Sequence, residues 1–152
     1  MHIVQAMFES GNLLYFNPFI FLDGGNPKPK FFVVLGEVNE TVLLASLPTS
    51  KDHIPSDVVV KSGCLEIAER MVNVYTFLAN EIVTDNGFFF DKNTFIYGQN
   101  IKTFNTTVFQ GQVSSGETII ELKGKIKDDI FTSLKNCLRQ SDAVRKKFKK
   151  YL

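Results

Sequence analysis

Phe31-Phe32-Val33-Val34-Leu35 is an unbroken apolar run, and a second apolar run, residues 41–47, follows it after Gly36 and Asn39. Short runs of β-branched and aromatic residues between Gly, Asn and Pro positions are typical of buried β-strands. A short connection that contains such turn residues favours antiparallel pairing of the strands on either side of it. The two runs therefore predict a β-hairpin at the centre of the fold.

Further strand-like runs flank this hairpin. They are residues 13–22, 58–60, 72–77 continuing into 82–83, 88–90, 94–97, 101–104 and 118–126. Turn sequences such as Asp-Gly-Gly-Asn-Pro and Asp-Asn-Gly separate them. Many short strands at this spacing are typical of a barrel or sandwich. We expect a mainly β, single-domain chain with a β-barrel over about residues 10–126.

The hydrophobic period changes after residue 126 and becomes helical. One helical face is formed by Ile130, Leu134, Cys137 and Leu138. Asp128 and Asp129 offer an N-terminal cap and a favourable charge in the first turn. This pattern predicts an amphipathic helix over about residues 127–140 that lies against the barrel. A more basic helix is predicted from about residue 142 onward, so residues 127–152 form a C-terminal helical segment.

Composition and charge exclude some classes of protein and leave several kinds of partner open. The chain has 152 residues, 44% hydrophobic and 22% charged, which excludes a disordered or coiled-coil protein. Residues 123–152 hold ten Lys or Arg against three Asp, a net charge of +7, and the remainder holds seven against thirteen, −6. Such a basic end fits nucleic acid, an anionic membrane or an acidic protein. It equally fits a solvated helix end whose lysines suit the helix dipole.

Cys64 and Cys137 belong to no CxxC motif or Cys/His cluster. We interpret both as reduced, buried residues of a cytoplasmic protein. The apolar residues 13–22 are interrupted by Asn17 and Pro18, so no signal peptide or membrane span is predicted. P-loop, GxGxxG, GxSxG and HExxH motifs are absent from the sequence, and no cofactor is predicted.

Two polar loops, residues 26–30 and 48–53, leave the same end of the predicted hairpin, which brings Lys30, Thr49, Ser50 and His53 toward one another. A lysine can hold a phosphoryl oxygen, a hydroxyl can hydrogen-bond it, and an imidazole can transfer a proton. This combination suits metal-free RNA cleavage by the neighbouring 2′-hydroxyl. Lysine and serine in loops are also commonly just solvated, and that alternative stays open.

Several motifs together resemble the MazF/PemK family of toxin–antitoxin endoribonucleases. Residues 28–35 are similar to its "RPALVL" strand, residues 44–50 to its strand ending in an "ITS" turn, and residues 54–58 to its "LPTHV" segment. Residues 99–104 are similar to its "DQIRTI" strand, and residues 122–126 with the following helix to its "KIGKL" strand and closing helix. The order of these motifs agrees over about residues 10–140.

The resemblance implies an SH3-like barrel, a homodimer, and metal-independent cleavage of single-stranded RNA that an antitoxin neutralises. Lys30 stands where the family has its catalytic arginine, and Thr49 where it has a threonine. Gln99 stands where the family has an aspartate. Ser50 and His53 complete the predicted catalytic set, and the further substrate-binding candidates are Lys28, Lys51, Gln99 and Lys102.

A second function class remains open: a catalytically inactive barrel of the same fold that binds nucleic acid or protein. Its contacts would come from aromatic faces and from the lysine-rich C-terminal segment. Phe88, Phe89 and Phe90 are candidates for stacking on bases, although three adjacent phenylalanines in a β protein usually belong to the core.

Overall fold

The computed structural model describes residues 2–152 of the chain. Its helices and strands are, in order, α1 (His2–Met7), β1 (Asn12–Phe19), β2 (Lys28–Val38), β3 (Thr41–Ser46), β4 (Gly63–Ile67), η1 (Ala68–Arg70), β5 (Val72–Phe77), β6 (Thr94–Tyr97), η2 (Gly98–Asn100), β7 (Ile101–Asn105), α2 (Thr106–Ser114), β8 (Ile119–Lys125), α3 (Asp128–Arg139) and η3 (Lys146–Tyr151). The η elements are short 3₁₀-helices.

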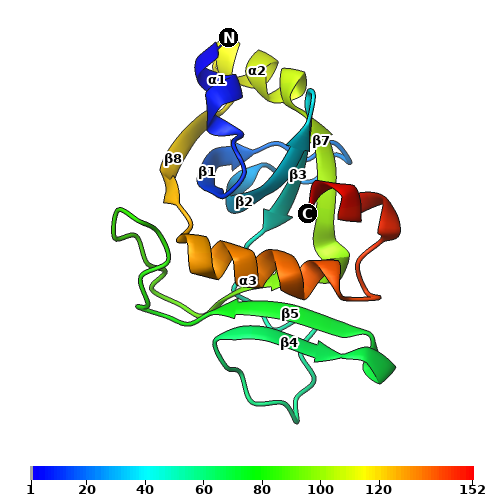
Figure 1. The fold of residues 1–152 in the computed structure, drawn as a ribbon. Coiled ribbons are helices and arrows are strands. Elements are labelled where there is room, and N and C mark those ends of the chain that lie inside the picture. The colour runs from blue at the N-terminus through cyan, green and yellow to red at the C-terminus, as the bar shows by residue number, and fades with distance from the viewer. Residues whose placement is uncertain (1) are drawn as a thin grey trace.

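The strands form two antiparallel sheets (Figure 1). The large sheet has the strand order β7-β3-β2-β1-β8, and the small sheet has the order β4-β5-β6. The mainly β fold is thus confirmed, but the predicted closed barrel is wrong, since β7 and β8 stand at opposite edges of the large sheet. The physical reason is that the chain leaves the large sheet after β3, builds the small sheet, and returns as β7.

The predicted hairpin is confirmed as β2 and β3, with Phe32 facing Ser46 and Val34 facing Leu44. Strand β2 is longer than the apolar run that predicted it. It begins at Lys28, which faces Phe19 of β1. Lys28 and Lys30 therefore lie in a strand, whereas the sequence placed them in a loop. Pairing with β1 holds these polar residues extended.

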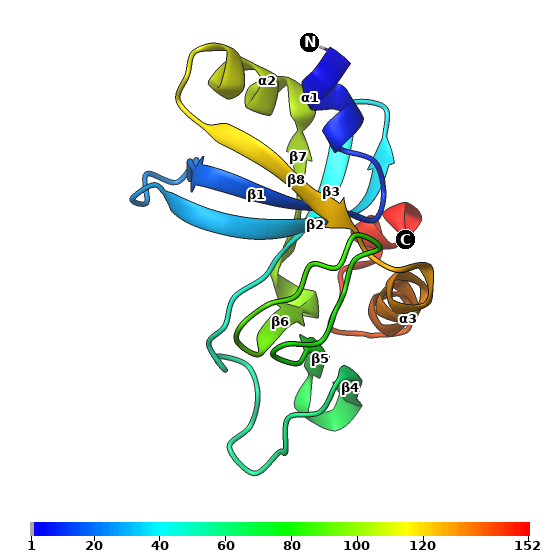
Figure 2. The same ribbon diagram turned by 90° about the vertical axis from the view of Figure 1, so that its left-hand side faces the viewer.

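The large sheet has a hydrophobic core on each face. Helices α1 and α2 cover one face, and α3 with the small sheet covers the other (Figure 2). The first core consists of Phe8, Leu14, Phe16, Phe19, Phe32, Val34, Val42, Leu44, Phe109 and Ile120. The second core combines residues of β1, β2, β3, β5 and β6 with α3, Val144 and Phe148. Because both faces of β2 and β3 are buried, their sequences are continuously apolar.

The amphipathic C-terminal helix is confirmed as α3, which buries the predicted residues Leu134, Cys137 and Leu138. Its cap differs from the prediction. Lys127 is the N-cap residue and makes no side-chain cap bond, whereas Asp128 and Asp129 occupy the first turn. The more basic segment beyond residue 142 forms the 3₁₀-helix η3 rather than an α-helix. Its Phe148 is buried against the sheet.

Some predicted strands are wrong and some elements were not predicted. Residues 58–60 form no strand, β5 ends at Phe77, and residues 82 and 89 form an isolated bridge. Of the three adjacent phenylalanines, Phe90 is buried, Phe88 packs partly against the core, and Phe89 remains 47% exposed. Helix α2 and strand β4 carry no clear apolar period and were missed.

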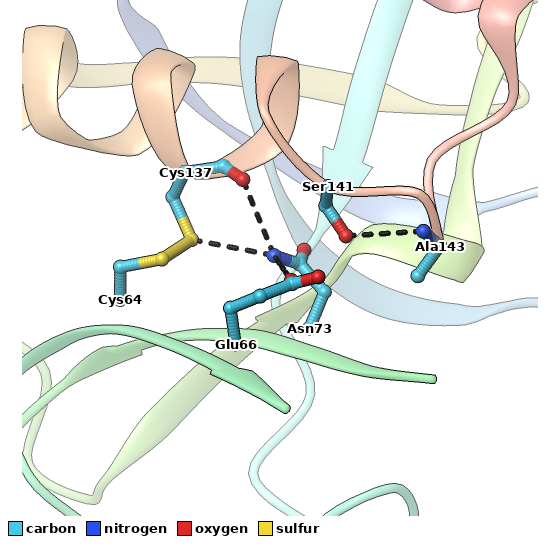
Figure 3. Close-up of a disulfide and its surroundings, with 6 residues drawn as sticks. All are labelled: Cys64, Glu66, Asn73, Cys137, Ser141 and Ala143. Carbon is cyan, nitrogen blue, oxygen red and sulfur yellow. Dashed lines mark hydrogen bonds between the residues drawn. A yellow bond between two sulfur atoms is a disulfide. The ribbon is translucent and has the colours of Figure 1, made fainter. Parts of the chain in front are cut away.

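The two cysteines form a disulfide, which corrects the prediction that both are reduced and buried (Figure 3). Cys137 of α3 is buried, but Cys64 of the edge strand β4 is exposed. The bond joins residues that are 73 positions apart. Within residues 2–152, no helix is long and apolar enough to cross a membrane.

Gly36 of β2 lies against the C-terminal end of the chain. A Cβ atom at this position would collide with the carbonyl group of Tyr151, lying 2.9 Å from its carbon. We expect Gly36→Ala to lower the free energy of unfolding by about 1–3 kcal/mol, because β2 or η3 must shift. Urea denaturation measures this change.

A matched control for Gly36 is Gly111, which lies inside α2 with open space at its Cβ position. Gly111→Ala is expected to raise the free energy of unfolding by about 0.5–1 kcal/mol, since alanine is the better helix former. Equal effects of the two substitutions would show that the contact between Gly36 and Tyr151 does not hold η3 in place.

Candidate functional site

A cavity of about 600 Å³ opens on the face of the large sheet that carries α2. It is bounded by the loop between β1 and β2, the strands β2, β3 and β7, and helix α2. Its aromatic walls are Phe19, Phe21, Phe32, Phe104 and Phe109. Its polar lining is Asp23, Lys30, Ser46, Asn100, Lys102, Thr103, Asn105 and Gln112. A cavity of this size that combines aromatic walls with convergent polar groups is typical of a ligand site.

Strand pairing accounts for the position of Lys30 in this cavity. Lys30 faces Phe16 of β1, and its side chain lies on the same face of the sheet as Phe32. The Lys30 Nζ atom is 5.3 Å from the centre of the Phe21 ring and 5.7 Å from that of Phe32. The Lys28 Nζ atom is 5.8 Å from the Phe21 ring. Cation–π contacts therefore hold both ammonium groups beside the aromatic wall.

Lys102 of β7 lines the same cavity, since it faces Leu44 of the neighbouring strand β3. Burial lowers the pKa of Lys30 below its usual value, and the nearby charges of Lys28 and Lys102 lower it further. Within the described residues, the ion pairs are Arg70–Asp57 and Lys123–Glu121, both outside the cavity. Asp23 also lines the cavity, but among the described residues it forms no ion pair with Lys28, Lys30 or Lys102, so the lysines give this site a positive net charge.

The lowered pKa of Lys30 predicts a pH dependence for anion binding. Affinity for a phosphate-containing ligand is expected to fall as the pH rises, and to begin falling at a lower pH than an ordinary lysine would cause, because Lys30 loses its proton before an ordinary lysine does. Lys30→Arg keeps its charge as the pH rises and should remove most of the dependence. Fluorescence anisotropy with a labelled RNA measures both proteins. Equal pH profiles would show that Lys30 does not contact the phosphate.

The loop after β3 forms a second polar cluster beside the cavity. The Leu47 N–H donates to Phe31 of the large sheet, and the next carbonyl, that of Pro48, accepts from Phe95 of the small sheet. The chain therefore crosses between the sheets at this point. We call residues 47–62, which connect β3 to β4, the crossing loop. Residues 48–53 continue over β6 and η2, where the Tyr97 hydroxyl donates to the Ser50 carbonyl at 2.7 Å.

His53 is held on this surface by two contacts. Its ring packs edge-on against the Tyr97 ring, with centroids 4.9 Å apart. Its Nδ1 lies 3.2 Å from Gln99 Nε2. This contact between the Gln99 amide and the ring nitrogen fixes the orientation of the imidazole. His53 is exposed, which leaves Nε2 accessible to a ligand.

The predicted site residues therefore fall into two adjoining groups. Lys30 and Lys102 line the cavity, and Lys28 lies at its aromatic wall. Four predicted residues (Thr49, Ser50, Lys51 and His53) lie on the crossing loop and outside the cavity lining. The Ser50 hydroxyl donates to Asp52 at 2.8 Å. Gln99, which contacts His53, is followed by Asn100 of the cavity lining and connects the two groups.

Sequence reasoning missed the aromatic wall at Phe21 and the contribution of α2. Tyr97, which anchors the crossing loop, was read only as part of a strand. The pairing of β3 with β7 would have placed Lys102 near Lys30, but residues 41–47 and 101–104 are far apart in the sequence. Phe21 and Lys28 lie on either side of a turn, so no hydrophobic period in the sequence indicates their contact.

No protein-family model matches the chain, and no curated protein is significantly similar to it. Among residues 2–152, no group of three or more His, Cys, Asp or Glu side chains is arranged to hold a metal ion. The functional interpretation therefore rests on the geometry of the cavity and of the crossing loop.

Proposed function

We propose that the protein is a metal-independent endoribonuclease that acts on single-stranded RNA, as the resemblance to the MazF/PemK toxins suggests. The observation that carries this proposal is the cluster of Lys28, Lys30 and Lys102 at an aromatic cavity without an ion-paired carboxylate. Single-stranded nucleic acid combines phosphates with unpaired bases, and it binds to cationic grooves that offer aromatic stacking surfaces.

The arrangement suggests a division of roles. Lys30 and Lys102 bind the phosphate and stabilise the charge that develops on its oxygens. His53 Nε2 lies at the exposed edge of the crossing loop and exchanges a proton with the RNA. The 2′-oxygen attacks phosphorus after losing its proton, the 5′-oxygen leaves with a proton, and a 2′,3′-cyclic phosphate remains. Thr49 and Ser50 lie on the same loop as His53, and we assign their hydroxyls a supporting role in binding the phosphate.

Gln99 is a predicted substrate-binding residue, and its Nε2 lies 3.2 Å from His53 Nδ1. We assign it the task of orienting the His53 ring. The lysine at position 30 supplies a point charge rather than the bidentate fork of an arginine, so it contributes charge and less geometric control.

The finer fold assignment belongs to the same proposal. The motifs of residues 28–35, 101–104 and 122–125 lie in strands of the large sheet and α3 follows them, whereas residues 54–58 lie in the loop between β3 and β4; on the sequence order of these motifs we propose an SH3-like, MazF/PemK-like relationship. A homodimer and a neutralising antitoxin follow from that relationship as further proposals.

The test is cleavage of a long single-stranded RNA by purified protein in EDTA. We expect discrete fragments with cyclic-phosphate ends from the wild type and none from Lys30→Ala or His53→Ala. Thr49→Ala tests the predicted hydroxyl, and Lys92→Ala is the matched control, because Lys92 is an exposed lysine outside the cavity. Fragments that persist in Lys30→Ala and His53→Ala would come from another nuclease.

A nucleic-acid-binding module without catalysis is the second candidate. The observation that favours it is the position of Thr49, Ser50 and His53 outside the cavity lining. Anisotropy measurements on the same proteins separate the two candidates. RNA that binds the wild type, is released by Lys30→Ala and stays intact for hours supports the binding module.

A further inference from the structure

Cys64 and Cys137, which form the disulfide (Figure 3), differ in their exposure to solvent. Cys64 lies in the edge strand β4 and is exposed, whereas Cys137 lies in α3 and is 6% exposed. An external thiolate therefore reaches the Cys64 side of the bond more readily. Attack at one sulfur expels the other as the leaving group, so this difference in access selects Cys137 to leave.

The surroundings of Cys137 suit a departing thiolate. The Asn73 side chain is 1% exposed, and its Nδ2 lies 3.4 Å from Cys137 Sγ. The same nitrogen donates to the Cys137 carbonyl at 3.3 Å and to Glu66 Oε1 at 2.9 Å. A buried N–H donor at the leaving sulfur stabilises negative charge on it.

We propose that Cys64–Cys137 is a thiol–disulfide exchange site whose reaction partner is an external dithiol. One thiolate of the dithiol attacks Cys64 Sγ, the Cys64–Cys137 bond breaks, and Cys137 leaves with the electron pair and takes up a proton. The second thiol of the dithiol then attacks the mixed disulfide and releases Cys64. The protein gains two electrons and two protons, and the dithiol becomes a disulfide.

Opening of the bond releases one end of the crossing loop. Residues 47–62 contain no helix or strand, and β4 follows directly. None of the five residues of β4 is buried; the strand is held by its pairing with β5, by the partial packing of Leu65 and Ile67 against β5 and β6, and by the disulfide. The other end of the loop remains fixed through Tyr97 and Gln99. Exchange at Cys64 thus increases the mobility of the part of the loop that lies between His53 and β4.

The first test determines which sulfur is attacked. Oxidised protein is treated with glutathione, quenched with acid and mapped by mass spectrometry. We expect glutathione on Cys64 and a free thiol at Cys137. With a chromogenic disulfide reagent, Cys64 in Cys137→Ser should react at least about tenfold faster than Cys137 in Cys64→Ser. Glutathione on Cys137, or equal rates in the two variants, would overturn the proposal.

The second test measures the consequence by hydrogen exchange at short labelling times, where local opening dominates. Reduction with dithiothreitol should increase exchange in residues 54–67 and leave β1, β2 and β3 unchanged. The double variant Cys64→Ser/Cys137→Ser should show the reduced pattern with and without dithiothreitol. Unchanged exchange in residues 54–67, or an equal increase throughout the large sheet, would overturn the proposed release. This result does not depend on cleavage of RNA, so it is independent of the proposed function.

Discussion

Replacing Cys64 and Cys137 together by serine is expected to lower the free energy of unfolding by about 4 kcal/mol. The disulfide joins residues 73 positions apart, and closing a chain loop of that length removes much conformational freedom from the unfolded state. Urea denaturation of the oxidised wild type and of the double variant measures the difference. The wild type in dithiothreitol should unfold at nearly the same urea concentration as the variant.

A buried serine at position 137 adds its own cost, because its hydroxyl needs a hydrogen-bond partner. The pair Cys64→Ala/Cys137→Ala provides the control without a hydroxyl. If all three reduced or substituted forms lose less than about 1 kcal/mol, the disulfide does not stabilise the attachment of α3 to β4.

Lys30→Ala is expected to weaken the binding of single-stranded RNA by about 10- to 100-fold. A hydrogen bond to a charged group contributes roughly 1.5–3 kcal/mol, and Lys30 is the half-buried member of the lysine cluster. Anisotropy titrations at fixed ionic strength measure the change in affinity. The same titrations over a range of salt concentrations give the slope of log affinity against log salt, which should become shallower by about the contribution of one phosphate contact. Lys92→Ala is the matched control and should bind RNA like the wild type.

Lys30→Arg separates charge from shape at this position. It should retain most of the affinity near neutral pH, because arginine also carries a positive charge. Unchanged affinity in Lys30→Ala, with circular dichroism showing a folded protein, would move the RNA site away from the cavity. A loss shared equally by Lys30→Ala and Lys92→Ala would indicate only a general effect of net charge.

The parts of the fold that the sequence predicted are those with a strong hydrophobic pattern. Strands β2 and β3 are buried on both faces, and α3 buries one stripe, so each has a clear apolar period. Helix α2 begins with β-branched residues and contains Gly111, which hides its helical character. Strand β4 alternates between exposed and half-buried residues and has no buried residue to mark it.

The candidate site was predicted only in part, for a physical reason. The sequence correctly placed two polar segments at one end of a hairpin, but it treated Lys30 and His53 as one cluster. At residues 47–48 the backbone hydrogen bonds change from Phe31 of the large sheet to Phe95 of the small sheet. Lys30 and His53 therefore lie on different sheets. The disulfide was missed because its partners meet only after the small sheet packs on α3, and sequence separation gives no sign of that contact.

The insertion of the small sheet between two paired strands has a consequence for the order of folding. Ala45 of β3 faces Ile101 of β7, so the chain returns beside the position from which it departed. Bringing Ile101 back to Ala45 closes a long chain loop, which costs conformational entropy before the contacts between β3 and β7 form. When residues 48–100 have already formed the small sheet, the distance that the chain must close is short. We therefore expect the antiparallel meander of β5 and β6 to gain protection from exchange before β7 docks on β3, which pulsed hydrogen exchange during refolding would reveal.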